Sequence, residues 1–113
     1  MAKRTFTKYP SSYVKATEYA TSRHPTISEE VIYNDLPWIA ERIAKDLNHW
    51  TEKFGHDCYT VESAIEAFVM MNDDYEDWWA RGCRSPEDED RFVQSLIEAM
   101  RSQGIELIDN RGK

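Results

Sequence analysis

The stretch DLPWIAERIAKDLNHWTEKF, residues 35–54, determines the fold that the sequence predicts. Its apolar side chains recur every three or four residues, which places them along one side of an α-helix. They are Leu36, Ile39, Ile43, Leu47, Trp50 and Phe54. Asp35 is a favourable N-cap, Pro37 is tolerated in a first turn, and Gly55 can end the helix in the left-handed conformation. We therefore expect a central amphipathic helix over residues 35–54.

The segments on both sides of this helix carry helical patterns of their own. Ser28 can cap a short helix that ends near Asn34, and a further helix is expected from Ser11 or Ser12 to Ala20. After Gly55, helices are expected to begin at Thr60, at Asn72 or Asp73, and at Ser85. The sequence thus predicts an all-α protein of four to five helices packed around the central one. Residues 1–10 are expected to form a basic flexible arm and residues 11–113 a single domain, with a minor strand pairing of the two chain ends.

Composition places the chain among soluble globular proteins. It has 113 residues, 41% of them hydrophobic, and a mean hydropathy of −0.73. No apolar run is long enough to span a membrane, and the N-terminus lacks an apolar leader. Cys58 and Cys83 match no zinc or redox spacing and are expected to be free thiols. We expect a cytoplasmic protein that does not bind membranes.

The charge is unevenly distributed along the chain. Residues 1–28 carry five basic residues and one acidic residue, whereas the remainder carries 9 basic and 20 acidic residues. Nucleic acid is bound through lysine and arginine, so direct binding to the acidic body is not expected. Weak binding of phosphate by the basic arm, through Lys3, Arg4, Lys8 and Lys15, remains a third hypothesis.

The most acidic stretch is NDDYEDWWARGCRSPEDEDR, residues 72–91. At about 100° per residue, its aromatic side chains share one side of a short helix and its first acids share the other. The first acidic cluster is Asp73, Asp74, Glu76 and Asp77; the second is Glu87, Asp88, Glu89 and Asp90. In the simplest interpretation the aromatics are core residues and the acids are merely solvated. Alternatively, acids of this density bind a basic protein surface and imitate the charge of a nucleic-acid backbone.

Trp38 lies on the side of the predicted central helix opposite the apolar stripe. A second layer of the protein commonly covers such a residue. The alternative is an exposed aromatic anchor, as in an adaptor or oligomerisation domain, and a homodimer is one assembly that this would allow.

Catalytic and metal-binding motifs are missing from the sequence. The glycines form no phosphate-binding loop, and no Gly-x-Ser-x-Gly, His-Glu-x-x-His or Cys-x-x-Cys motif occurs. The acids lack the spacing of a calcium loop, and His49, His56 and Cys58 lack an evident fourth ligand for zinc. Cys58 and His56 also lack a third group that would orient them as a nucleophile and base. We expect no enzyme activity, metal or cofactor.

The leading hypothesis is an acidic protein–protein interaction module. Its partner-binding residues are expected to be Asp73, Asp74, Glu76, Asp77, Glu87, Asp88, Asp90 and Trp38. In size, acidity and lack of catalytic motifs, the chain resembles in general style the proteins of phages and mobile elements that block nucleic-acid enzymes. That resemblance implies an inhibitor that acts as a DNA mimic.

Overall fold

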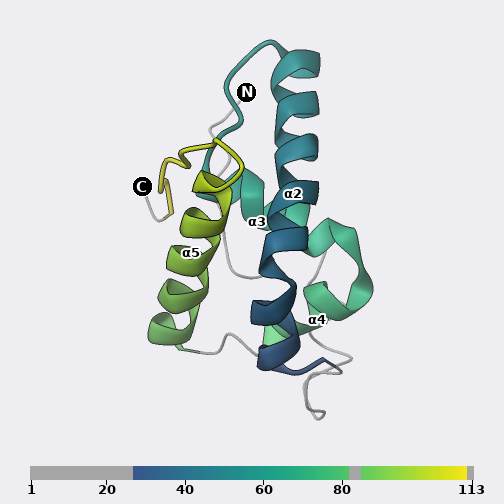
Figure 1. Cartoon of the computed structure of the whole chain (residues 1–113), viewed down its shortest axis with the longest axis vertical. Helices are drawn as coiled ribbons and strands as arrows, with labels where there is room; N and C mark the ends of the chain where they lie inside the picture. Colours follow the sequence, from purple (N-terminus) through teal and green to yellow (C-terminus); the bar gives the residue numbers. More distant parts are fainter. Residues whose placement is uncertain (1–26, 82–84, 112–113) are drawn as a thin grey trace.

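The computed structural model describes residues 27–81 and 85–111. These residues form four α-helices: α2 (Glu29–Phe54), α3 (Val61–Met71), α4 (Asp73–Arg81) and α5 (Pro86–Arg101) (Figure 1). Within these ranges the structure has no β-strand, and its only ladder contact is an isolated parallel bridge between Thr60 and Ile108. The predicted all-α class is confirmed. The expected arm, the expected helix up to Ala20 and the N-terminal half of any strand pairing lie outside the described residues.

α2 is longer than predicted, because it runs without interruption through Asn34 and Asp35. It begins at Ser28, whose hydroxyl accepts a hydrogen bond from the Val31 backbone N–H. The prediction that Asp35 caps a separate helix is therefore wrong. Pro37 lies inside α2, where it has no N–H to give to the hydrogen-bond ladder and its ring crowds the carbonyl four residues earlier. Burial of residues on both sides of the proline outweighs that local cost, and sequence rules for helix ends do not register such burial.

The remaining helix boundaries follow the predicted capping residues. Thr60, Asn72 and Ser85 each accept a hydrogen bond from the backbone N–H three residues later, at 3.2, 2.8 and 3.1 Å. Gly55 ends α2 at φ 71°, in the left-handed conformation, and its N–H donates to the Thr51 carbonyl. Gly104 has φ 79° just after α5, where Ile105 N–H donates to the Met100 carbonyl. The predicted caps and the predicted left-handed end at Gly55 are confirmed.

The core lies between α2 and the other three helices: α5 runs alongside α2, and α3 crosses behind it (Figure 1). Its centre is a group of aromatic rings from three helices. The Phe68 ring of α3 lies 5.0 Å from that of Tyr75 and 4.9 Å from that of Phe92 in α5, and Trp78 of α4 lies 5.0 Å from Phe92. Burial of these large apolar side chains is the main source of the stability of the fold.

The apolar stripe predicted for residues 35–54 is buried along most of its length. Leu36, Ile39, Ile43 and Leu47 are buried. Phe54 departs from the prediction, because it is 56% exposed and stacks on His56 instead of entering the core. Within residues 27–81 and 85–111, no helix has both the length and the apolar character needed to cross a membrane.

Candidate functional site

The first acidic cluster lies on α4, and its position follows from the aromatic side of that helix. Tyr75 and Trp78 are 3% exposed and Trp79 is 1% exposed, so the interpretation of these aromatics as core residues is confirmed. The acids lie on the other side of the helix. Asp73 and Asp74 are exposed, whereas Glu76 and Asp77 are half-buried. We call these four residues the α4 acidic face.

A hydrogen bond joins α4 to α2 at the edge of this face. The Tyr75 hydroxyl donates to Asp35 Oδ2 at 3.3 Å. Burial, followed by the negative charge of Asp35, raises the pKa of Tyr75 above its usual range. Asp35, which the sequence suggested as a cap, therefore positions α4.

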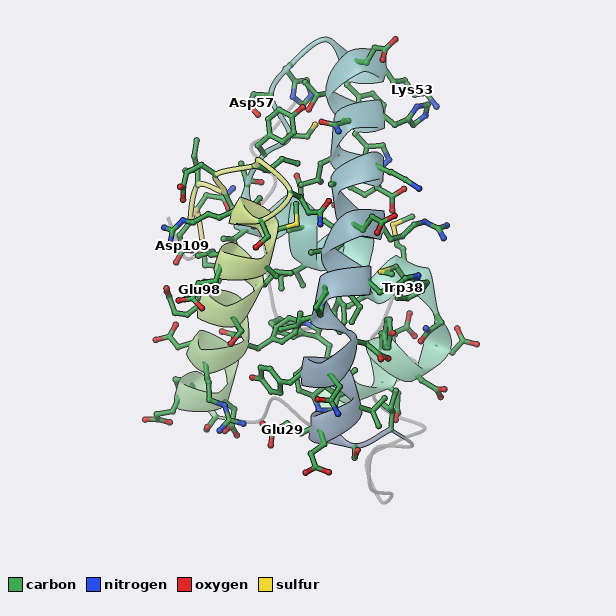
Figure 2. All side chains as sticks on the ribbon, viewed as in Figure 1. Glu29, Trp38, Lys53, Asp57, Glu98 and Asp109 are labelled. Atoms are coloured by element: carbon green, nitrogen blue, oxygen red, sulfur yellow. The ribbon has the colours of Figure 1, made fainter. Side chains whose placement is uncertain are left out.

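Trp38 lies close to this junction. It is three residues beyond Asp35, so the two side chains are neighbours on the surface of α2. It is 55% exposed and lies on the side of α2 away from α5 (Figure 2). The N-terminal segment, one of the layers expected to cover Trp38, lies outside the described residues. Trp38 thus lies on α2 three residues from Asp35, the residue that contacts Tyr75 of α4.

The second acidic cluster lies at the start of α5 and is partly engaged within the protein. Glu87 and Asp90 are exposed, whereas Asp88 and Glu89 are half-buried. Asp90 accepts a hydrogen bond of 2.8 Å from Nη2 of Arg111, which belongs to the C-terminal segment. Hydrogen bonding to Asp109 and Asp90 raises the pKa of Arg111, so that its guanidinium stays charged.

The two acidic clusters lie on different surfaces. Trp78 and Trp79 of α4 both contact Phe92 of α5, with ring centroids 5.0 and 5.9 Å away. Because the aromatic side of α4 faces α5, its acidic face points away from α5. In Figure 1, α4 starts on the side of α2 opposite α5, and its last turn passes behind the lower end of α2. The intervening residues 82–84 lie outside the described part of the chain.

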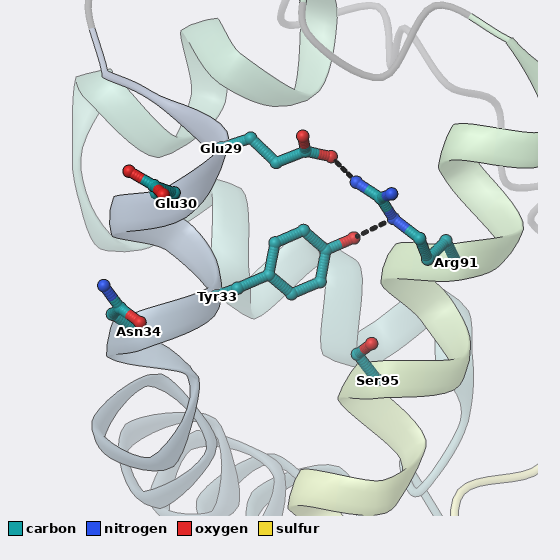
Figure 3. Close-up of a pocket in the computed structure, with 6 residues that line it drawn as sticks. All are labelled: Glu29, Glu30, Tyr33, Asn34, Arg91 and Ser95. Atoms are coloured by element: carbon teal, nitrogen blue, oxygen red, sulfur yellow. Dashed lines mark hydrogen bonds and ion pairs between the residues drawn. The ribbon is translucent and has the colours of Figure 1, made fainter.

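An open pocket of about 350 Å³ lies between the first turns of α2 and the first half of α5 (Figure 3). It is lined by Glu29, Glu30, Tyr33, Asn34, Arg91 and Ser95. The Arg91 guanidinium pairs with Glu29, its Nε donates to the Tyr33 hydroxyl at 3.4 Å, and it lies 5.3 Å from the Tyr33 ring centroid. The sequence predicted none of this, because the lining residues come from segments about 60 positions apart.

The candidate ligands and nucleophiles near Gly55 do not form a compact site. Cys58 is buried; its Sγ lies 3.9 Å from His56 Nδ1 and donates to the His56 carbonyl at 3.6 Å. His56 is exposed and stacks on Phe54. Across residues 27–81 and 85–111, no three or more side chains of the metal-binding types are placed to share an ion.

Comparison with known proteins does not assign the chain to a family. The chain matches no family model, and neither curated proteins nor solved structures give a significant match.

Proposed function

We propose that this protein acts by binding another protein, and that the α4 acidic face docks on a basic surface of that partner. The observation that carries the proposal is the separation of the two sides of α4. Its aromatic side chains are almost completely buried in the core, at 1–3% exposure, while Asp73 and Asp74 remain exposed. Asp73 and Asp74 therefore lie outside the apolar core, and a role at the surface would account for their position.

Electrostatics supports a cationic partner. Carboxylates in the first turn of a helix gain about 0.3–1 kcal/mol each from the helix dipole, which explains part of the cluster. Asp77 lies beyond that turn, and four neighbouring carboxylates repel one another. A basic partner relieves this repulsion. The proposed partner surface is one that ordinarily binds nucleic acid, and the protein would inhibit it as a DNA mimic.

The test is the simultaneous substitution of Asp73→Asn, Asp74→Asn, Glu76→Gln and Asp77→Asn. The probe is a nine-residue arginine peptide, titrated calorimetrically at two salt concentrations. We expect the substitutions to weaken binding at least about tenfold, because charge pairs steer and stabilise such a complex. Circular dichroism should show unchanged helicity.

The matched control neutralises the same number of carboxylates as the α4 substitutions do, but at positions outside α4. Glu41→Gln, Glu52→Gln, Glu98→Gln and Glu106→Gln neutralise four exposed carboxylates of α2, α5 and the following segment. If this control weakens binding as much as the α4 substitutions do, the peptide senses only net charge and the proposal fails. The same variants can then be compared in capture of a partner from the native host.

A second candidate function is an adaptor or oligomerisation domain that binds through Trp38. Its support is the 55% exposure of this side chain, since exposed tryptophans are frequent anchors in interfaces. In the titrations above, Trp38→Ala should leave peptide binding unchanged if charge dominates. Binding that is lost in Trp38→Ala but insensitive to salt would favour this second function over the first.

A further inference from the structure

The C-terminal segment Ile105–Arg111, which we call the strap, ties α3 to α5. Leu107 is 5% exposed and belongs to the core. The next residue, Ile108, donates its N–H to the Tyr59 carbonyl at 3.0 Å and accepts the Val61 N–H at 2.9 Å. The strap therefore follows α5 in the chain, but Ile108 forms its backbone hydrogen bonds at the start of α3.

The end of the strap completes the N-terminal cap of α3. The Glu62 N–H donates to Asn110 Oδ1 at 3.1 Å, whereas the following N–H, that of Ser63, donates to Thr60 Oγ1 at 3.2 Å. Helix N-termini leave such N–H groups without partners inside the helix. The strap thus protects the Glu62 N–H from hydrogen exchange with water. Thr60 protects the Ser63 N–H in the same way, independently of the strap.

Arg111 fastens the strap to α5. Its guanidinium donates from Nε and Nη2 to the two oxygens of Asp109, both at 3.0 Å, and from Nη2 to Asp90 Oδ1 at 2.8 Å. Its Nη1 lies 3.9 Å from Glu89 Oε2, and only 17% of the side chain is exposed. Three carboxylates therefore surround one guanidinium, and two of them belong to the second acidic cluster.

We propose that Arg111 competes with an arginine side chain of a binding partner for these three carboxylates. Glu89, Asp90 and Asp109 form a guanidinium-binding site that the protein fills with its own arginine. An arginine side chain of a basic partner binds there by displacing Arg111, which loosens the end of the strap. The proposal rests on the proposed function for the existence of a basic partner, and it concerns α5 and the strap rather than the α4 acidic face.

The bound guanidinium itself specifies the chemistry of the ligand. A planar guanidinium forms two parallel hydrogen bonds with one carboxylate, as Arg111 does with Asp109, whereas a lysine ammonium cannot. Arg111 is held in place by the chain, which gives it a high effective concentration. Its removal should therefore strengthen the binding of an external arginine.

The first test compares Arg111→Ala with the wild-type protein in titrations with the nine-residue arginine peptide. We expect about fivefold tighter binding by Arg111→Ala. Adding Glu89→Gln and Asp90→Asn to that variant should cancel the gain. Arg101→Ala is the matched control, because Arg101 is exposed and pairs with Glu106 of the strap at 3.0 Å but not with the three carboxylates. Equal affinities of Arg111→Ala and wild type, or an equal gain in Arg101→Ala, would overturn the proposal.

The second test uses the wild-type protein and does not depend on the stability of a variant. Amide hydrogen exchange is followed by NMR with and without the arginine peptide. We expect the peptide to accelerate exchange of the Glu62 amide at least about threefold, with little change at the Ser63 amide. No change at Glu62 at saturating peptide would contradict displacement of the strap.

These results separate the two proposals. If the α4 acidic face is not the binding surface, its neutralisation has no specific effect, yet the ratio of affinities between Arg111→Ala and wild type remains. If Arg111 is not a competitor, Arg111→Ala and wild type bind the peptide equally, whether or not the α4 acidic face is neutralised.

Discussion

Tyr75 illustrates how a single residue can combine packing with charge. Its ring stacks on Phe68 in the core, with centroids 5.0 Å apart, and its hydroxyl reaches the Asp35 carboxylate. Burial and the charge of Asp35 both disfavour the phenolate and raise the Tyr75 pKa above 10.0. The folded protein therefore retains this proton at pH values at which the unfolded chain has lost it.

This difference predicts a loss of stability in alkali. The contribution of Tyr75 is complete below pH 10.0 and declines as the pH rises from there through the raised pKa of the folded state. Tyr75→Phe should remove this part of the pH dependence, while lowering the free energy of unfolding near pH 8 by about 1 kcal/mol through loss of the hydrogen bond. Urea unfolding between pH 8 and pH 11 measures both effects.

Tyr59→Phe is the control for this prediction. The Tyr59 hydroxyl donates to the neutral side-chain oxygen of Asn48 at 2.6 Å, so the variant also loses a hydrogen bond but no contact with a carboxylate. If Tyr75→Phe and wild type lose stability equally between pH 10 and pH 11, the assignment to Tyr75 is wrong.

At the scale of the element, α2 tolerates a proline that capping rules placed in a first turn. Pro37 is exposed inside the helix and has no N–H to donate to the carbonyl of Tyr33, four residues earlier. The buried residues before and after it keep the helix continuous; they are Ile32, Leu36, Ile39 and Ala40. Tertiary packing thus overrides a local signal that would otherwise divide the helix.

Replacement of the proline should reveal the cost that packing offsets. We expect Pro37→Ala to raise the free energy of unfolding by about 1–3 kcal/mol, because alanine restores the missing N–H and has the highest helix propensity. Thermal or urea unfolding monitored by circular dichroism measures the gain. His49→Ala, at another exposed position of α2, should change stability by less than about 0.7 kcal/mol. A loss of stability in Pro37→Ala would mean that the core requires the local geometry that proline imposes.

At the scale of the whole molecule, the strap closes the core from the C-terminal end. Leu107 and Ile108 are adjacent, yet Leu107 is 5% exposed and Ile108 is 59% exposed. The alternation follows from the extended backbone, whose successive side chains point in opposite directions. Only one of the two large side chains therefore contributes substantially to the core.

This pair supplies a matched test of the closure. Leu107→Ala should lower the free energy of unfolding by about 2–4 kcal/mol, since it leaves a cavity in the core. Ile108→Ala should cost less than about 1 kcal/mol, because its backbone hydrogen bonds to Tyr59 and Val61 do not need the side chain. Equal costs in urea unfolding would show that the strap does not seal the core through Leu107.

The arrangement of the helices also determines which acids can act together. The aromatic side of α4 packs against Phe92 of α5, so its acidic face and the start of α5 point in different directions. The sequence leaves open whether the two acidic clusters within residues 72–91 form one surface, and in the fold they lie on two. Asp35, three residues before Trp38, instead joins α2 to Tyr75 of α4.

Local sequence patterns were sufficient for features that depend on neighbouring residues. The all-α class, the caps at Thr60, Asn72 and Ser85, the left-handed end at Gly55 and the inward aromatic side of α4 all follow from spacing and side-chain chemistry within one or two helical turns. The residues that decide these features lie close together in the sequence, and for that reason the features can be inferred from the residues alone.

Long-range contacts were required for the remainder. The continuity of α2 through Pro37, the pairing of Arg91 with Glu29, and the enclosure of Arg111 by carboxylates depend on residues that are far apart in the chain or on burial by other helices. Their free energy arises from desolvation and geometry that exist only after the helices have packed. The sequence contains every one of these charges, but the folded structure determines which are neutralised internally and which remain exposed at the surface.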